Sequence, residues 1–332
     1  MKFKFMLFFI VLLGLTFTSA LAGNFNKVGT SGAQELLIPV GARGSSMGGA
    51  LTANSEGLES VFWNPAGLAS MEGTEIMFSH IPYFADIDVN FGGFAKKFED
   101  FGTLAFSAKV VSIGDIEETT TLEPEGTGTS FNPTMSVIGV SYAKVLTANV
   151  SFGATFTYIN ETIFDVKASG MAFDAGFIYN PRWRGVSFGM VIKNYGPTMK
   201  FDGPGFDRSY EEAGQRVVSP NATGFELPSF IKFGVAYDFM DDGPNFATVT
   251  GNFVSNNFSE DQWQGGFEYV YDSKYSIRGG YNYSSQEDYI YGLSFGAGLT
   301  YEVGESNVTF EYSWTETEFF DANQYFTAKI NF

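Results

Sequence analysis

Few side chains in this sequence could carry out chemistry. Its 332 residues include one histidine, His80, and no cysteine. A serine hydrolase needs an imidazole to activate its nucleophile, and thiol catalysis or a thiolate metal site needs cysteine. His80 lies among aromatic residues in the stretch FSHIPYF, which is typical of a structural position. We therefore expect that the protein is not an enzyme and that it binds no cofactor.

Acidic residues are the other candidates for metal ligands or acid–base groups. The pairs Glu117–Glu118 and Asp241–Asp242 lie in stretches typical of turns, where carboxylates are normally solvated. The stretch DGPGFD at 202–207 combines acids with glycines but lacks the ligand spacing of an EF-hand. The sequence therefore predicts no metal site, and calcium binding in long outer loops stays open as an alternative.

The first 22 residues have the organisation of a secretory signal peptide. Lys2 and Lys4 form a basic start, residues 6–15 form an apolar centre, and Ala20-Leu21-Ala22 matches a cleavage site. The formal net charge is −18, and removal of this segment takes two lysines with it, so the exported chain is more acidic still. Such a chain cannot neutralise phosphates, and we expect no nucleic-acid partner.

The composition after this leader indicates a β-barrel of the outer membrane. After the leader, the sequence contains no window of about 18 uninterrupted apolar residues that could form a transmembrane helix. Yet aromatic residues make up 17% of the chain, with 37 Phe and 17 Tyr beside 39 Gly. In the stretch NVTFEYSWT, 307–315, apolar and polar residues alternate, as the lipid-facing and lumen-facing sides of a barrel strand require. In YIYGLSFGAGLTY, 289–301, the same alternation places Tyr289 and Tyr291 on the outer face.

The alternation predicts an antiparallel transmembrane barrel of 14 strands, spanning residues 74–332. Tyr and Trp lie near the strand ends, which is typical of the aromatic girdles around a hydrocarbon band. The two long connections, 113–133 and 196–227, follow the third and seventh strands and so lie at the same end. The last strand, QYFTAKINF, ends on an aromatic residue and resembles an insertion signal. The strands are expected at about 74–81, 88–98, 102–112, 134–146, 149–161, 168–180, 184–195, 228–240, 245–256, 261–271, 274–284, 289–302, 305–317 and 324–332.

Residues 23–73, between the leader and the first strand, contain too little apolar sequence for a separate domain. The inward faces of the strands are rich in Gly, Ser and Thr, which leaves space inside the barrel. Charged residues on these faces either pack a filled interior or line a polar pathway; they are Lys193, Lys232, Glu268, Arg278 and Glu311. We therefore expect residues 23–73 to form a plug in the lumen.

A motif within residues 37–70 makes this segment similar to the corresponding region of a known protein family. It contains GAR, then MGGA, then a short acidic piece, and finally WNPAGL. This order resembles the N-terminal region of FadL-like outer-membrane proteins, and more closely their PorV/PorQ branch. In VFWNPAGLAS, 61–70, an Asn followed by Pro also predicts the capped start of a short helix. The motif residues are Gly41, Arg43, Met47, Gly48, Gly49, Trp63, Asn64, Pro65, Ala66 and Gly67.

The resemblance implies a barrel in the bacterial outer membrane whose N-terminal segment is a structural or gating plug. In that setting Arg43 could reach carboxylates of the lumen. Two functions follow from the two branches. PorV/PorQ proteins work with type IX secretion machinery, and because the motif resembles this branch more closely, we expect a function in protein secretion or cell-surface assembly by binding exported cargo or secretion components. FadL-like proteins transport long-chain fatty acids or other hydrophobic compounds, and here 81–87 and 224–230 are apolar loop segments that could line such a pocket.

Overall fold

The computed structural model describes residues 29–206, 208–210, 216–218, 222–286 and 289–332. The predicted leader, 1–22, lies outside these residues and stays a prediction. Antiparallel strands dominate the chain and form one sheet of 15 strands. One of these, the two-residue strand β10 (Phe201–Asp202), pairs only with the start of β8 and is not part of the barrel wall. The other strands close into a ring, because β1 pairs with β19 and β8 pairs with β9. The predicted 14-stranded antiparallel barrel is confirmed.

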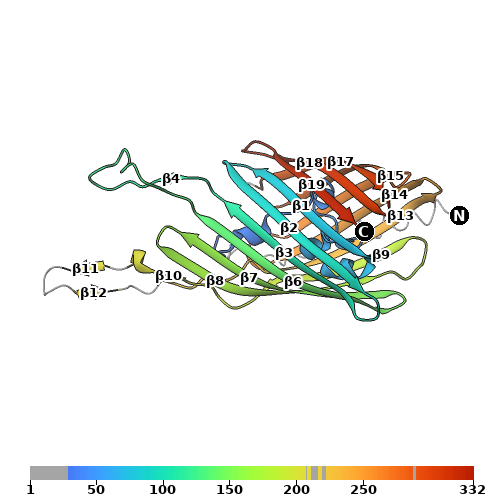
Figure 1. The fold of residues 1–332 in the computed structure, drawn as a ribbon, viewed down its shortest axis with the longest axis horizontal. Coiled ribbons are helices and arrows are strands. Elements are labelled where there is room, and N and C mark those ends of the chain that lie inside the picture. The colour runs from blue at the N-terminus through green and yellow to red at the C-terminus, as the bar shows by residue number, and fades with distance from the viewer. Residues whose placement is uncertain (1–28, 207, 211–215, 219–221, 287–288) are drawn as a thin grey trace.

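The barrel strands follow one another around the wall in chain order (Figure 1). Each predicted strand is present, and its bounds differ from the prediction by only a few residues. The strands are β1 (Thr74–Tyr83), β2 (Ile87–Phe98), β3 (Gly102–Ser112), β6 (Thr134–Thr147), β7 (Val150–Ile163), β8 (Val166–Tyr179), β9 (Val186–Tyr195), β13 (Phe230–Asp242), β14 (Asn245–Asn256), β15 (Gln262–Tyr271), β16 (Tyr275–Ser284), β17 (Tyr291–Val303), β18 (Ser306–Thr317) and β19 (Asn323–Asn331).

The two long connections extend from the same end of the barrel (Figure 1). The connection after β3 carries the paired strands β4 (Ile116–Glu117) and β5 (Ser130–Phe131). The connection after β9 carries β10 (Phe201–Asp202), the 3-10 helix η4 (Pro204–Phe206) and the paired strands β11 (Arg208–Tyr210) and β12 (Arg216–Val218). We call these connections, 113–133 and 196–227, the first and second arms.

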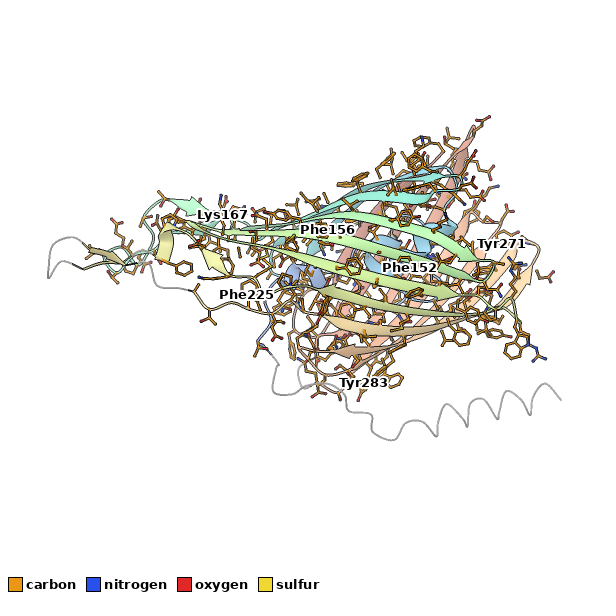
Figure 2. The ribbon with its side chains drawn as sticks, turned by 90° about the horizontal axis from the view of Figure 1, so that it is seen from below. Phe152, Phe156, Lys167, Phe225, Tyr271 and Tyr283 are labelled. Carbon is orange, nitrogen blue, oxygen red and sulfur yellow. The ribbon has the colours of Figure 1, made fainter. Side chains whose placement is uncertain are left out.

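The side chains of the wall alternate as expected. Phe310 is 58% exposed on the outside, whereas the next residue, Glu311, is buried inside. Figure 2 shows Phe156 and Tyr283 on the outer surface, and both are exposed. The predicted outward positions of Tyr289 and Tyr291 are wrong, because both side chains line the interior of the barrel, with ring centres 5.9 Å apart. A register irregularity between Tyr291 and Ser294 interrupts the alternation at the start of β17, and the Tyr291 hydroxyl contacts that of Tyr83 inside the rim.

Short helices make up most of the regular structure before β1. They are η2 (Gln34–Leu37), α2 (Ala42–Ser46), α3 (Ser60–Trp63) and η3 (Pro65–Ser70). No helix among the described residues is long and apolar enough to cross a bilayer. The helix α2 packs against β16 to β19, and η3 packs against β6, β7 and β8. We call residues 29–73 the N-terminal segment, and from Val40 to Ala69 almost all of it is buried.

Candidate functional site

The site begins with Arg43, which lies on α2 and is only 7% exposed. Its Nε donates to Glu268 Oε1 at 2.9 Å and its Nη2 donates to Oε2 at 2.7 Å, which is a bidentate pair with the wall strand β15. Burial disfavours the charge of Arg43, but Glu268 and Glu56 outweigh this effect and hold its pKa above the ordinary value. The Arg43 charge therefore ties the N-terminal segment to the wall.

The pair belongs to a chain of alternating buried charges that crosses several strands. Arg278 Nε contacts Glu268 at 2.7 Å, and its Nη1 contacts Glu311 at 2.8 Å. Lys329 then joins Glu311, at 2.7 Å, to Glu59 of the N-terminal segment, at 2.8 Å. We call these residues, together with Arg43, the charge chain. The two ends of the charge chain, Arg43 and Glu59, both lie in the N-terminal segment. Glu59 also accepts hydrogen bonds from the Gly44 amide and the Trp63 indole.

Inward-facing glycines of the wall seat the N-terminal segment. A Cβ atom at Gly280 would lie 2.1 Å from the carbonyl carbon of Met47, and one at Gly153 would lie 2.2 Å from that of Pro65. A Cβ at Gly189 would lie 2.3 Å from the Thr52 carbonyl oxygen. Because these contacts are with backbone, no side-chain rotation could relieve them. The glycines of β7, β9 and β16 therefore let the segment approach the wall at a distance that other residues would prevent.

Asn64 fixes the turn between α3 and η3. Its Oδ1 accepts from the Ala66 amide at 3.1 Å, with Pro65 at the start of η3, so the predicted cap is present. Its Nδ2 donates to the carbonyls of Thr52, at 2.8 Å, and of Phe177 on β8, at 3.2 Å. One buried amide thus caps a helix, braces the segment internally and binds the wall.

The remaining motif residues shape the same contacts. Gly41 has a φ of 84°, and a Cβ there would lie 2.3 Å from the Glu59 carboxyl group. Met47 and Ala66 are buried, and the backbone of Gly48 and Gly49 lies against wall residues of β16 and β15. A Cβ at Gly67 would lie 2.3 Å from the Ser55 carbonyl oxygen. The structure thus places the whole motif inside the barrel, in contact with the wall or with itself.

Three lysines of the wall surround the aromatic pair Phe62–Trp63. Lys193 Nζ lies 2.9 Å from Asp174 and donates to the Phe62 carbonyl at 2.6 Å. Lys109 Nζ donates to the Ile38 carbonyl at 2.9 Å and lies 5.1 Å from the centre of the Phe62 ring. Lys232 Nζ lies 5.5 Å from the Trp63 ring. The aromatic faces thus interact with cations that the wall buries.

A cavity of about 500 Å³ lies between the N-terminal segment and the wall. Leu37, Ile38, Phe62 and Trp63 of the segment border it. The two apolar loop segments singled out in the sequence contribute Tyr83, Phe84, Ile87 and Phe230. Amide side chains of β14 to β16 complete the wall; they are Asn256, Gln262, Gln264 and Asn282. The cavity lies toward the end that carries the arms, since Asp88, next to Ile87, pairs with Ser112, where the first arm begins.

Glu35 borders this cavity from η2 and is buried. Burial raises the pKa of its carboxyl group more than its own backbone amide and Lys109 lower it. The folded protein therefore retains this proton to a higher pH than the unfolded chain does. Because the folded-state pKa lies above the ordinary 4.5, stability should fall as the pH rises above that value through the raised pKa.

The raised pKa of Glu35 gives a testable prediction about the pH dependence of stability. Glu35→Gln keeps the shape of the protonated carboxyl group, so it should remove the loss of protection that wild type shows between acidic and alkaline pH. Hydrogen exchange of the backbone amides at 33–38 measures the effect. The variant and wild type should agree at low pH and diverge above it, with wild type exchanging faster. Equal exchange at high pH would contradict the prediction.

No catalytic arrangement is formed in the described residues. The Gly-x-Ser-x-Gly pattern of serine hydrolases occurs at 44–48, 185–189 and 292–296. Ser46 of the first donates to the Arg43 carbonyl, and the other two cover ordinary strand residues of β9 and β17. His80 Nδ1 is hydrogen bonded to Asn90, at 2.9 Å. The described acidic residues include no group of three that could hold a metal ion.

Sequence comparison identifies one family. The family model of the type IX secretion system protein PorV matches residues 22–255. No curated protein matches the chain. The family is one of outer-membrane barrels without enzymatic activity, in agreement with the prediction that the protein is not an enzyme.

The fold is shared with solved outer-membrane transporters. The toluene transporter TodX of Pseudomonas putida superimposes with a TM-score of 0.55 at 12% identity, covering 88% of this chain and 97% of that one. The toluene transporter TbuX of Ralstonia pickettii gives 0.53 at 15%, with 88% and 98% covered. A FadL homologue of Pseudomonas aeruginosa gives 0.52 at 12%, with 89% and 98% covered. At these identities the likeness establishes the barrel architecture alone.

Proposed function

Because the chain belongs to the family of the type IX secretion system protein PorV, we propose that it acts in protein secretion or cell-surface assembly by binding exported protein partners. The family match over residues 22–255 carries this proposal. The match places the protein in the bacterial outer membrane. The partner itself, and the leader that would bring the chain there, belong to the proposal.

The arms provide the surface for such a partner. Both project from one end of the barrel, beyond the lipid-facing wall (Figure 1). The first arm carries five acids and no basic residue between 113 and 133. Leu122 at its tip is 91% exposed. A surface of this kind suits a protein partner with basic residues and a small apolar contact, because opposite charges steer association.

Replacement of the first arm tests the proposal. Ser112 and Thr134 are paired on β3 and β6, so a two-residue Asn-Gly turn can join these strands in place of 113–133. We expect recovery of exported protein with the purified barrel to fall at least about tenfold, because interface energy is concentrated in few residues. Heat-modifiable gel migration should be unchanged, which controls for barrel folding.

A charge variant of the same arm sharpens the test. Changing its five acids to the corresponding amides keeps the arm's length and should reproduce part of the loss. The acids are Asp115, Glu117, Glu118, Glu123 and Glu125. Undiminished recovery of exported protein with the arm removed would contradict a role for it in partner binding.

We further propose that the N-terminal segment, 23–73 in the sequence prediction, acts as a plug that keeps the lumen closed. The charge chain, the glycine contacts and the cap at Asn64 support this proposal, since each of them attaches the segment to the wall. Deletion of residues 24–70 should raise the ion conductance of the barrel in planar bilayers. Unchanged conductance would contradict the proposal that the segment is a plug, without affecting the assignment of the barrel.

Transport of hydrophobic compounds is the second candidate function. The observation that favours it is the cavity, which has many apolar residues on its border and lies toward the end that carries the arms, together with the toluene transporters that share the fold. It predicts that the barrel co-purifies with apolar small molecules and no exported protein.

A further inference from the structure

The end of the barrel opposite the arms has exposed basic residues on one half of its rim. This end carries short turns, as the periplasmic end of a barrel does. Lys96 lies on β2, Lys144 lies on β6, and Arg182 and Arg184 lie in the turn between β8 and β9. The order of strands in the wall is β2, β3, β6, β7, β8, so these cations share one continuous stretch of it. We call the four cations, together with Trp183, the basic rim.

Two of these cations belong to the lipid-facing side of the wall. Along β2 the exposed residues are Phe94, Lys96 and Phe98, and the Lys96 Nζ lies 5.7 Å from the centre of the Phe98 ring. Along β6, Lys144 continues the exposed face to which Val140 belongs. A lysine at the end of such a face can lay its stem against apolar surface while its ammonium group reaches the level of the lipid head groups.

The turn between β8 and β9 presents the other two cations around an aromatic ring. Arg182 and Arg184 flank Trp183, which is 58% exposed. Both arginines have a positive φ, of 56° and 55°, which is uncommon for residues other than glycine. The Arg184 guanidinium lies 5.2 Å from the centre of the Trp183 ring. Tryptophan is enriched at the level of the head groups, so this turn combines an interfacial ring with two charges.

Hydrogen bonds to neighbouring turns position the basic rim without neutralising it. Lys144 Nζ donates to the Asp100 carbonyl at 2.6 Å, and Arg182 Nη2 donates to the Ala148 carbonyl at 3.2 Å. Both acceptors are uncharged backbone oxygens. Within the described residues no carboxylate forms an ion pair with a cation of the basic rim, and this includes Glu99 and Asp100 of the turn after β2. The four charges are therefore available to an anion from outside the chain.

The other half of the same rim has the opposite charge. The turns after β13, β15 and β17, with the strand ends beside them, contain a single cation, Lys274, which lies 3.4 Å from Asp272 and 3.8 Å from Glu302. The acids of these turns are Asp241, Asp242, Asp272, Glu302 and Glu305. Because the whole chain has a formal net charge of −18, a half rim of cations without carboxylate partners is a local exception to its composition.

We propose that the basic rim binds anionic diacyl phospholipids, with their phosphate head groups on the cations and their acyl chains along the outward faces of β2 and β6. Guanidinium groups suit this role because their fork of donors matches two phosphate oxygens. A lipid fits better than a soluble acidic protein, since Lys96 and Lys144 continue faces that contact the bilayer. The inference goes beyond the proposed function and is independent of it, because the arms lie at the other end of the barrel (Figure 1).

Quenching of Trp183 by brominated lipids tests the proposal. Trp63 is buried in the lumen, so W263F and W314F leave Trp183 as the exposed tryptophan that lipid can reach. This full chain is placed in phosphatidylcholine vesicles that contain increasing fractions of brominated phosphatidylglycerol or, separately, of brominated phosphatidylcholine. Half-maximal quenching should need roughly 5- to 25-fold less of the anionic lipid, since each basic residue near an anionic head group contributes about a fivefold preference.

Two variants of this chain show whether the preference comes from the basic rim. K144Q/R182Q/R184Q should need equal fractions of the two lipids, while its quenching by brominated phosphatidylcholine stays unchanged, which shows that Trp183 still lies in the bilayer. K167Q/K200Q/R216Q removes the same charge from the end that carries the arms and should keep the preference. Salt at about 1 M should weaken the preference, because the cations are exposed.

Three outcomes would overturn the proposal. The first is equal quenching by the two lipids in the starting chain, and the second is a preference that survives in K144Q/R182Q/R184Q. The third is an acidic soluble protein that binds the detergent-purified barrel and is lost in that variant, without any lipid preference; it would assign the basic rim to a protein partner instead. None of them affects partner binding by the arms, which replacement of 113–133 tests separately.

Discussion

Replacing Gly280 by valine should open the barrel. The Cβ of any residue at this position of β16 would lie 2.1 Å from the carbonyl carbon of Met47 and 2.2 Å from the Gly48 amide nitrogen. Backbone cannot rotate away, so either the N-terminal segment or the strand must move. The strand is held on both sides by pairing with β15 and β17, and we expect the segment to be displaced.

The expected result is a conductance in planar bilayers close to that of the 24–70 deletion. The displaced segment should also become accessible to added protease. Overpacking of this kind typically costs about 1–3 kcal/mol, occasionally more, and the strand pairing on both sides of Gly280 directs this cost to the N-terminal segment rather than to the sheet. The effect should be the largest that a single substitution in the wall produces on conductance.

The adjacent glycine supplies a matched control. Gly279 lies on the same strand with the opposite orientation, and a Cβ there would be 3.7 Å from the Phe295 ring, which is ordinary contact. Gly279→Val therefore adds the same side chain toward lipid and should leave conductance unchanged. If Gly280→Val conducts no more than Gly279→Val while both barrels are folded, the N-terminal segment does not close the lumen.

Neutralising Glu268 should destabilise the protein more than any other single charge change. Glu268→Gln keeps the shape of the side chain but leaves Arg43 and Arg278, both buried, with one carboxylate fewer. Removing one partner of a buried ion pair costs about 3–5 kcal/mol. We expect a loss of this size in the free energy of unfolding, measured in urea with the barrel in lipid vesicles and followed by tryptophan fluorescence.

Two further variants show whether the loss comes from the charge chain. Glu302→Gln disrupts an exposed contact with Lys274, at 3.8 Å, and should cost less than about 1 kcal/mol. Glu268→Gln leaves Arg43 with Glu56 as its one remaining carboxylate, 2.8 Å from its Nη1. Adding Arg43→Met removes this buried, incompletely compensated cation and should restore part of the stability, so that the two changes are not additive. Additive losses would contradict direct coupling between the N-terminal segment and β15.

The wall was predictable from the sequence because its signal is local. Alternation within NVTFEYSWT decides which side of β18 faces lipid, and a tight turn decides where the next strand begins. The same rule failed at Tyr291, where an irregularity in β17 shifts the alternation. Gly292 lies within this irregularity, and a glycine inside a strand pattern is the one signal that could have indicated it. The motif identified the N-terminal segment by resemblance, and Asn64–Pro65 gave its helix start by local chemistry.

The interior was beyond prediction for the opposite reason. Arg43 and Glu268 are separated by 225 positions, and periodicity shows only that Glu268 points inward. Alternation places Gly280, two residues after the inward Arg278, on the inner face and Gly279 on the lipid face, but nothing in the sequence shows that the backbone of Met47 lies against Gly280. Glu59 and Lys329 were not among the predicted site residues, although an acid within the motif and an inward lysine on the last strand were signals for them.

The central claim, that the barrel works by binding exported proteins, is tested most directly by gentle extraction from native outer membranes followed by mass spectrometry of everything that co-purifies. We predict an exported protein or a secretion component in stoichiometric amount, lost when the first arm is replaced. Small apolar molecules or acids recovered without any protein partner would contradict the claim and favour transport through the cavity.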